Sequence, residues 1–273
     1  MLERFKYTNS FNETLDFGSD NLFVNENDLR DFAWDITSKN NKISSFKKGI
    51  VSKTIPVILK CNTETEGVEL RNRLFEVFEK DVLAKQHGKI HIGDYYLKCY
   101  ITGSKKTEYL NHMSYMLVSL TVQTDCPEWI KETTTTHGVY DENSNEFLDY
   151  AHDFPYDFKN EFGKSRFVNP SFTASNFIMV IDGAISNPRL FIGGHEYSVD
   201  VTVAQGEYLT IDSSNKTIVL TKENGEKVNC FKNRNRDSYI FEKIQPGSNE
   251  ITSAKQIKFT LTLLDERSEP KWT

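Results

Sequence analysis

Two histidines are the first residues in this sequence whose types and spacing could bind a metal ion. His87 and His91 lie four positions apart, the spacing that places two ligands on one face of a helix. Gly88 stands between them, and glycine is a common C-terminal cap of a helix. The spacing therefore loses its geometric meaning, and with no third ligand evident the sequence predicts no metal at this pair.

A second pattern resembles the start of a calcium-binding loop. Asp141, Asn143 and Asn145 have the spacing of its first three ligands. However, Glu146 stands where the loop needs glycine, and His152 stands where it needs a bidentate glutamate. We interpret the stretch as a polar linker, and we expect the protein to need neither a metal nor another cofactor.

A basic cluster, FKNRNRD, covers residues 231–237. Arg234 and Arg236 could bind a phosphate or the carboxylates of a partner, although a solvated hairpin tip explains them equally well. The sequence has no GxSxG, no HExxH and no glycine-rich phosphate loop. Carboxylates are frequent in this acidic chain, and without a pocket none can be named an acid or a base. The sequence therefore predicts that the protein is not an enzyme.

Composition limits the class of protein. The 273 residues favour two domains, and 19 Phe and 12 Tyr favour β structure. A net charge of −6 gives no general attraction for nucleic acids or anionic membranes. Four scattered cysteines, without a CxxC, indicate reduced thiols. Since the sequence starts without a signal peptide and lacks a long apolar run, we expect synthesis in the cytoplasm and no membrane partner.

The first domain is expected over residues 1–132, with strands at 53–61 and 114–126 and one helix near 65–87. Thr63 and Glu66 fit a capping box at the start of the helix. Leu70, Leu74 and Phe78 repeat at helical spacing, so we expect them to form the structural core of the helix against a sheet.

A proline, four consecutive threonines and a polar stretch predict a linker or extended crossover over residues 127–146. The linker and a second domain then occupy residues 133–273, where short strands recur between turns, as in a β-sandwich or jelly roll. The last strand, at 255–267, belongs to the second domain or returns to the first. The predicted fold class is mainly β, with an N-terminal β-sandwich or barrel-like domain that carries one α-helix.

Several strings resemble one family. NFIMVIDGAISNPRLFIGG, GEYLTIDSSNKTIVL and FEKIQPGSNEI are similar to the galectin-like jelly-roll β-sandwich of siphophage distal tail (Dit) proteins. HGKIHIGDYYLKCYITG resembles the strand pair after the single N-terminal helix of that family, and SEPKWT resembles its usual ending. The resemblance spans about residues 50–273 and depends on the order of moderately specific motifs.

This resemblance implies a structural hub of the tail tip or baseplate that takes part in host attachment. Such proteins form a hexameric ring through their N-terminal domains and join the tail tube protein to the tail-associated tip protein or lysin. They can also carry receptor-binding proteins, and DNA passes through as cargo. The implied location is the tail tip of the virion.

Carbohydrate binding is a second interpretation, and a cell-wall glycoside hydrolase is a third. Asn187 and Arg189 match part of the galectin sugar-site motif, but Ile185 replaces its histidine, and residues 136–265 contain no tryptophan to stack on a sugar ring. Tyr197 or Tyr239 would have to supply that ring. Asn187 is also a typical turn residue.

Overall fold

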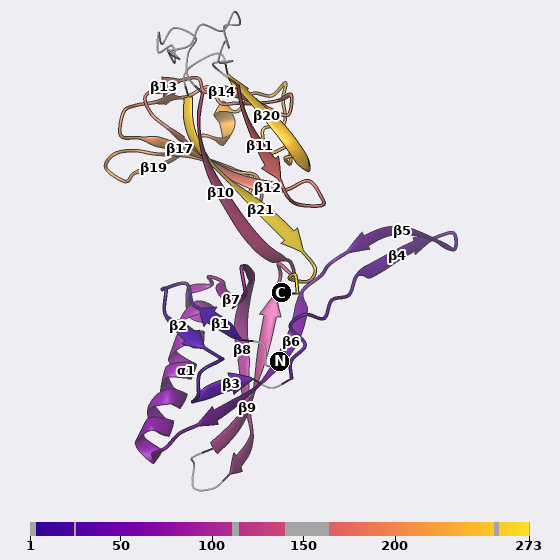
Figure 1. Ribbon diagram of the computed structural model, residues 1–273, viewed down its shortest axis with the longest axis vertical. Helices are drawn as coiled ribbons and strands as arrows, with labels where there is room; N and C mark the ends of the chain where they lie inside the picture. Colours follow the sequence, from indigo (N-terminus) through magenta and orange to yellow (C-terminus); the bar gives the residue numbers. More distant parts are fainter. Residues whose placement is uncertain (1–3, 25, 111–114, 140–163, 254–256, 273) are drawn as a thin grey trace, which may run out of the picture. The chain divides into compact units, whose positions relative to one another are not determined.

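The structure is a computed structural model that describes residues 4–24, 26–110, 115–139, 164–253 and 257–272 (Figure 1). The chain divides into two compact units: unit 1 holds residues 1–131 and 266–273, and unit 2 holds residues 132–265. The chain therefore leaves unit 1 within β10 (Trp129–Val139) and returns to it within β21 (Ile257–Arg267). The calcium-like stretch at 141–152 lies outside the described residues.

Unit 1 contains two sheets that share one long strand, β8. The first half of β8 pairs with β7 and β10, and its second half pairs with β9. One sheet thus has the order β2-β1-β7-β8-β10 and the other the order β3-β6-β9-β8. The strands of these sheets that are not yet bounded are β1 (Phe5–Thr8), β2 (Thr14–Asp16), β3 (Leu22–Val24), β6 (Val51–Lys60), β7 (Gly88–Ile92), β8 (Tyr95–Leu110) and β9 (Tyr115–Thr124).

Helix α1 (Glu64–Ala84) packs one face on the core of unit 1. The hydroxyl of Thr63 caps its start by accepting a hydrogen bond from the Glu66 amide at 3.2 Å. Leu74 and Phe78 are buried, and Leu70 is partly buried against the same core. The apolar stripe of the helix is therefore covered by the sheets of its own unit.

The helix ends differently from the sequence-based expectation. Lys85, in the left-handed region with φ 53°, is the C-cap, and Gly88 is already the first residue of β7. Glycine is needed at 88 for space, because a Cβ there would overlap the Tyr7 hydroxyl and the Asp81 carboxylate. The prediction of Gly88 as the cap was wrong because a tertiary contact, and not the backbone conformation, requires this glycine.

A buried carboxylate joins the helix to the first strand of unit 1. The side chain of Asp81 is fully buried and accepts a hydrogen bond from the Tyr7 hydroxyl. Its other oxygen accepts bonds from the Ser10 amide at 2.8 Å and the Ser10 hydroxyl at 2.6 Å. Because its partners satisfy both oxygens, this buried polar group holds α1 against β1 without an uncompensated desolvation cost.

Unit 2 contains two main sheets that enclose a second core, with strand orders β19-β18-β17-β12-β21-β10 and β11-β20-β14-β15. The predicted mainly-β class is confirmed, whereas the galectin-like form of unit 2 stays a prediction. Its strands not yet bounded are β11 (Lys164–Asn169), β12 (Asn176–Asp182), β13 (Ile185–Ser186), β14 (Arg189–Ile192), β15 (His195–Ser198), β16 (Thr202–Val203), β17 (Tyr208–Asp212), β18 (Thr217–Thr221), β19 (Lys227–Asn229) and β20 (Gly247–Ser253).

The threonine run expected in a linker belongs to strand β10. The hydroxyls of Thr134 and Thr262 are 2.9 Å apart, and those of Thr136 and Thr260 are 3.4 Å apart. Threonine is β-branched, so a run of it suits an extended strand with cross-strand hydroxyl contacts. Of the two predicted forms, the linker was therefore wrong over residues 129–139, and the extended crossover agrees with β10, which runs from unit 1 into unit 2.

Candidate interaction surfaces

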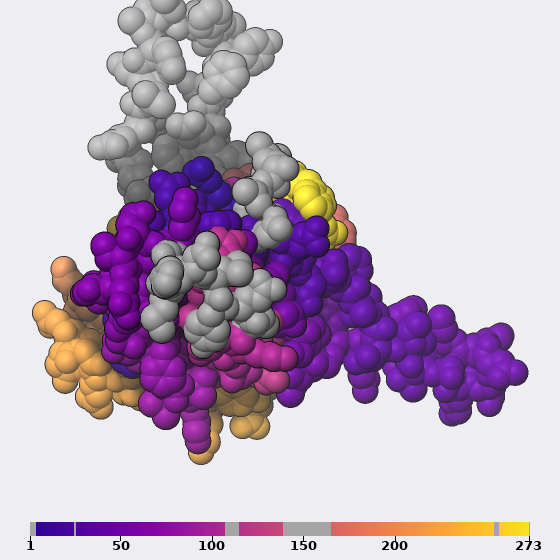
Figure 2. Space-filling view, turned by 90° about the horizontal axis from the view of Figure 1, so that it is seen from below, coloured from indigo at the N-terminus to yellow at the C-terminus, as the bar shows by residue number. Residues whose placement is uncertain are grey.

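A two-stranded hairpin projects from unit 1. It consists of β4 (Asp35–Lys39) and β5 (Lys42–Lys47), which pair with each other and with no other strand among the described residues. Asn40 and Asn41 connect them with φ values of 52° and 57°, as a type I′ turn requires. Figure 2 shows the hairpin as a purple arm that extends beyond the rest of unit 1.

The pairing register gives this hairpin two unlike faces. Ile36 lies opposite Phe46, and Ile43 lies opposite Ser38 on the same side. Trp34 joins this side through an edge contact with Phe46, the ring centroids being 6.4 Å apart. The opposite side carries the polar pairs Asp35–Lys47, Thr37–Ser45 and Lys39–Lys42.

We call Trp34, Ile36, Ile43 and Phe46 the apolar hairpin face. Ile36, Ile43 and Phe46 each expose 57–59% of their surface. Phe32 and Ile50, which flank the hairpin, are also exposed. Contiguous exposed apolar surfaces are typical of sites that contact another molecule.

The root of the hairpin is held firmly. The Lys48 ammonium lies 4.5 Å from the centre of the Trp34 ring and 3.4 Å from a carboxylate oxygen of Glu128. Nearby, the buried Lys53 ammonium donates hydrogen bonds to the carbonyls of Asp28 and Asp31, where the chain approaches the hairpin. Burial lowers the pKa of Lys53, and the nearby carboxylates of Asp28 and Asp31 oppose that shift. The contacts of Lys48 and Lys53 thus hold the base of the hairpin in place beneath its exposed apolar face.

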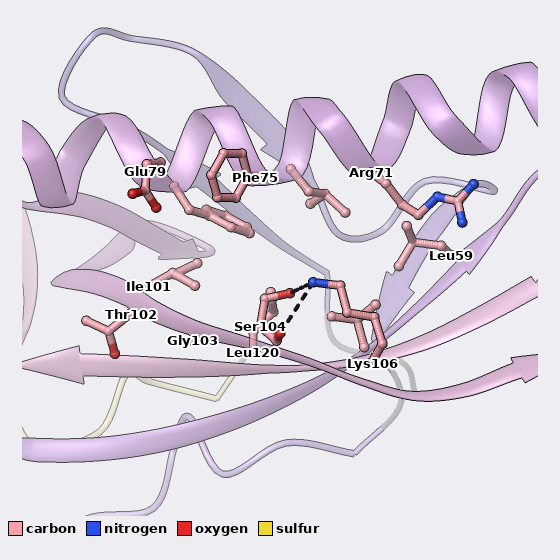
Figure 3. Close-up of a pocket in the computed structure, with 13 residues that line it drawn as sticks. Leu59, Arg71, Phe75, Glu79, Ile101, Thr102, Gly103, Ser104, Lys106 and Leu120 are labelled. Atoms are coloured by element: carbon pink, nitrogen blue, oxygen red, sulfur yellow. Dashed lines mark hydrogen bonds between the residues drawn. The ribbon is translucent and has the colours of Figure 1, made fainter.

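A small groove lies between α1 and strands β8 and β9 (Figure 3). Its volume is about 270 Å³. Leu74 and Ile101 contribute to its apolar lining, while Arg71 and Lys106 add charge. Phe75 lines it and exposes 63% of its surface. The groove can accept an apolar side chain from another molecule, with cationic groups beside it.

The sugar-site candidates near the start of β14 have protein partners. Asn187 occupies a left-handed turn with φ 52°. Arg189 makes an ion pair with Glu196 at 2.7 Å. Tyr197 is buried, packs edge-on against Phe177 and donates its hydroxyl proton to the Glu242 carbonyl at 2.9 Å. Tyr197 therefore presents no free ring face for stacking on a sugar.

The remaining candidates gather in one open pocket of about 560 Å³ in unit 2. Arg234, Arg236 and Tyr239 line it together with Phe231. The Arg234 guanidinium lies 4.0 Å from the centre of the Phe231 ring, and Tyr239 exposes 51% of its surface. Exposed aromatic rings beside guanidinium groups are suited to a polar ligand with a flat apolar face, such as a saccharide.

Glu196 links Arg189 to this pocket. It accepts hydrogen bonds from Arg189 at 2.7 Å, Ser198 at 2.8 Å and Asn235, a pocket residue, at 3.1 Å. The hydrogen bond from Arg189 is the largest cause that lowers the pKa of Glu196, followed by that from Ser198. The carboxylate therefore stays ionised and orients one wall of the pocket.

The two histidines of the sequence analysis do not form a pair. His91 lies on β7 beside the Tyr96 ring, whereas His87, just before β7, contacts Asp125 at 2.7 Å. Burial raises the pKa of Asp125, but the hydrogen bond and charge of His87 outweigh it, so the net pKa is lowered. His87 thus has a partner that lies far away in the sequence.

Sequence reasoning missed the apolar hairpin face. The signal was present, because Asn-Asn between two short segments with alternating apolar residues is typical of a type I′ hairpin. By contrast, the adjacent tyrosines of β8, Tyr95 and Tyr96, are buried within this chain. The hairpin, and not this tyrosine pair, thus carries an exposed apolar surface of unit 1.

Comparisons with known proteins find the same fold in phage tail structures. No family model matches the sequence, and no curated protein matches it either. The crystal structure of the Dit protein of phage SPP1, described as a paradigm of the hub adsorption apparatus in phages that infect Gram-positive bacteria, is similar with a TM-score of 0.62. That match has 10% sequence identity and covers 96% of this chain and 98% of that one.

A chain of the phage P2 baseplate, in its activated conformation with Ca, matches with a TM-score of 0.59. The identity is 13%, and the match again covers 96% of this chain and 98% of that one. The same baseplate with Sr gives equal values. At these identities the likeness establishes a shared fold over nearly the whole length. Among the described residues, no helix is both long and apolar enough to cross a membrane.

Proposed function

We propose that this protein is a structural hub subunit of a siphophage tail tip or baseplate. In this proposal six copies form a ring that joins the tail tube to the tail-associated tip protein and lets DNA pass through its centre. Receptor-binding proteins attach at its periphery. The fold shared with phage hub proteins over 96% of the chain supports this role.

The apolar hairpin face is the observation that carries the ring proposal. An isolated two-stranded hairpin is only marginally stable in water, yet this one exposes a whole apolar side. Full burial of a Val, Leu, Ile or Phe side chain stabilises a protein by about 1.5–3 kcal/mol relative to full exposure. Covering the apolar hairpin face with a second copy would therefore have two effects: it would favour association, and it would order the hairpin.

The contact would be heterologous, since the hairpin projects on one side of unit 1 and needs a different surface as its receptor. Head-to-tail contacts between identical chains generate a closed ring when the rotation between neighbours closes. The hairpin is thus suited to a ring of copies. Because its base is held by the contacts of Lys48 and Lys53, it would fix the position of one subunit relative to the next.

Mass measurement in solution and negative-stain imaging of the full chain test the ring. We expect a sixfold particle with a central hole. A stable monomer at all accessible concentrations, with no assembly on tail tubes, would contradict the proposal.

Two matched variants test the hairpin itself. Ile36→Asp and Thr37→Asp place the same carboxylate at adjacent positions of β4, but only Ile36 belongs to the apolar hairpin face. We expect Ile36→Asp to give monomers while Thr37→Asp still forms rings. If both variants assemble normally, the hairpin is not the subunit contact.

The pocket in unit 2 supports a second candidate function, the binding of host cell-wall saccharide. Tyr239 would stack on a sugar ring, and Arg234 and Arg236 would bind hydroxyl or anionic groups. Titration with host wall polysaccharide tests this function, with Tyr239→Ala as the variant. Tyr208→Ala is the control, because Tyr208 is also exposed but does not line the pocket. Saturable binding that only Tyr239→Ala removes would support the lectin role, and no binding to wild type would exclude it.

A further inference from the structure

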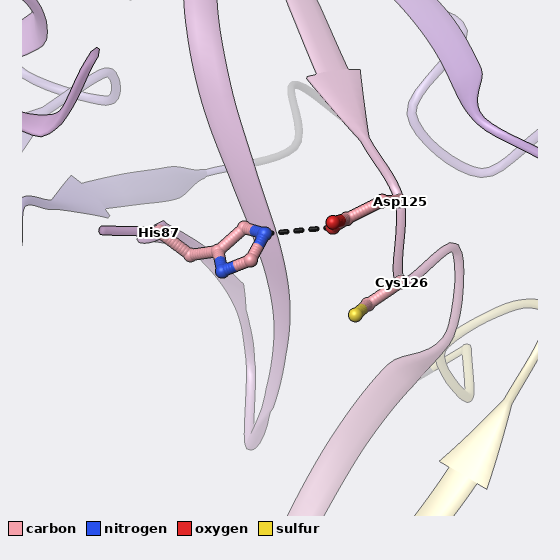
Figure 4. A group of neighbouring side chains, drawn as sticks. All are labelled: His87, Asp125 and Cys126. Carbon is pink, nitrogen blue, oxygen red and sulfur yellow. Dashed lines mark hydrogen bonds and ion pairs between the residues drawn. The ribbon is translucent and has the colours of Figure 1, made fainter. Parts of the chain in front are cut away.

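We propose that His87, Asp125 and Cys126 bind a divalent metal ion of the zinc type, with one coordination position left open. Figure 4 shows the three side chains converging from two segments of unit 1. One ligand atom from each residue can be chosen so that all three lie within 4.8 Å of one another. Asp125 and Cys126 are nearly forty positions from His87 in the sequence, so no spacing motif joins the three residues.

Strand ends bring these residues together. His87 lies just before β7, and Asp125 and Cys126 lie just after β9, while β8 pairs with both of these strands. The Tyr100 ring, on β8, packs beside His87 with 4.6 Å between ring centroids. The sheet register therefore fixes the positions from which the ligands approach.

The backbone that carries Cys126 is also anchored. The buried Thr124 hydroxyl accepts a hydrogen bond from the Cys126 amide at 3.0 Å and donates one to the Lys98 carbonyl at 2.7 Å. Residues that hold metal ligands in place in this way raise metal affinity, because less freedom is lost on binding. Cys126 is a free cysteine and is only partly exposed.

The distances suit a small tetrahedral ion. Ligand atoms about 2.0–2.3 Å from a tetrahedral centre lie roughly 3.3–3.8 Å from one another. In the metal-free arrangement His87 Nε2 and Asp125 Oδ1 are 2.7 Å apart, joined by a hydrogen bond. An ion would replace that bond by moving the two atoms apart by less than about 1 Å. Small rotations of the His87 and Asp125 side chains are sufficient for this pair, and the Cys126 sulfur lies within 4.8 Å of a ligand atom of each of these two residues.

The donor atoms select the metal. One imidazole nitrogen, one carboxylate oxygen and one sulfur suit Zn²⁺ or Co²⁺, whereas Ca²⁺ prefers six or more oxygen ligands. On binding, the thiol of Cys126 loses its proton to solvent and the thiolate forms the metal–sulfur bond. Three protein ligands leave a fourth position for water or for a ligand from another molecule. The ion would tie the corner between α1 and β7 to the connection between β9 and β10.

Cobalt(II) and zinc titration of the reduced full chain tests the site. We expect one Co²⁺ per chain with a thiolate-to-cobalt charge-transfer absorption, displacement of Co²⁺ by Zn²⁺, and no comparable binding of Ca²⁺. Cys126→Ser should abolish the absorption and weaken Zn²⁺ binding by at least about tenfold. His87→Gln should weaken it similarly.

His91→Gln is the control, because His91 lies on the neighbouring strand outside the cluster. It should bind Co²⁺ as the wild type does. Circular dichroism shows whether each variant is folded. The proposal fails if wild type gives no thiolate-to-cobalt absorption, or if Cys126→Ser binds Zn²⁺ as tightly as wild type. Neither result would bear on the proposed hub role, which depends on the hairpin and not on this cluster.

Discussion

Unit 1 has two amphipathic elements with opposite fates. The stripe of α1 that contains Leu74 and Phe78 is buried by the sheets of the same chain. The apolar hairpin face has a comparable pattern but remains exposed. An amphipathic pattern therefore indicates that a face will be covered, while only the topology decides whether the cover comes from the same chain or from another molecule.

The largest effect is expected at the covered face. Phe78→Ala would remove a buried ring that packs edge-on against Tyr7, with 5.2 Å between ring centroids. We expect the free energy of unfolding to fall by about 3–5 kcal/mol, because a cavity replaces the ring. Urea unfolding of the isolated protein measures this change. A loss below about 1 kcal/mol would show that the stripe is not core.

Gly88→Ala should have the next largest effect. The added methyl group would overlap the Tyr7 hydroxyl and the Asp81 carboxylate, so the buried hydrogen bonds between β1 and α1 must shift. We expect a loss of about 1–3 kcal/mol in unfolding free energy, typical of overpacking. Gly49→Ala is the control, because Gly49 does not have a positive φ. Gly93→Ala is unsuitable, because Gly93 has a φ of 56° that alanine rarely adopts. Equal stability of Gly88→Ala and wild type would mean that this contact is loose.

Phe46→Ala tests the exposed face, where truncation should affect assembly more than the stability of the monomer. Phe46 exposes 58% of its surface, so at concentrations where the chain is monomeric the free energy of unfolding should change by about 0.5 kcal/mol or less. The same variant should weaken ring formation, which light scattering over a dilution series measures. If Phe46→Ala destabilises the monomer as much as Phe78→Ala, the hairpin face is covered within its own chain.

The smallest expected effect is a pH dependence on the exposed side of α1. Lys80 donates to both Glu13 carboxylate oxygens at 2.7 and 2.8 Å, and this bond, followed by that from Asn9, lowers the pKa of Glu13 below 4.5. The folded pKa is below the unfolded one, so this stabilisation is present above pH 4.5 and is lost as the pH falls through the folded pKa.

Urea unfolding of Glu13→Gln and of wild type across acidic pH measures this contribution. The difference in unfolding free energy between the two should shrink as the pH falls. A constant difference for Glu13→Gln would mean that the ion pair does not persist in solution.

Local signals explain what the sequence predicted well. The mainly-β class followed from aromatic and β-branched segments, and Thr63 marks the start of α1 through its own side chain. The predicted end of the helix was wrong because glycine is required at 88 by its close contact with Tyr7, a residue some eighty positions away. The linker interpretation of the threonine run was wrong because threonine is β-branched as well as polar, and β-branching favours a strand.

The candidate sites depended more on tertiary register. Arg234, Arg236 and Tyr239 are close in sequence, so their common pocket was within reach of sequence reasoning. The cluster of His87, Asp125 and Cys126 was not, because it exists only once β8 pairs with both β7 and β9. No spacing pattern in the sequence predicts that these three side chains lie close together.

The return of the chain to unit 1 sets an order of events during synthesis. The Arg30 guanidinium lies 3.9 Å from the centre of the Trp272 ring and donates to the Pro270 carbonyl at 2.8 Å. Both partners are translated only after all of unit 2, residues 132–265, which takes roughly 7–27 seconds at 5–20 residues per second. The contacts around Arg30 therefore form only after all of unit 2 has been translated.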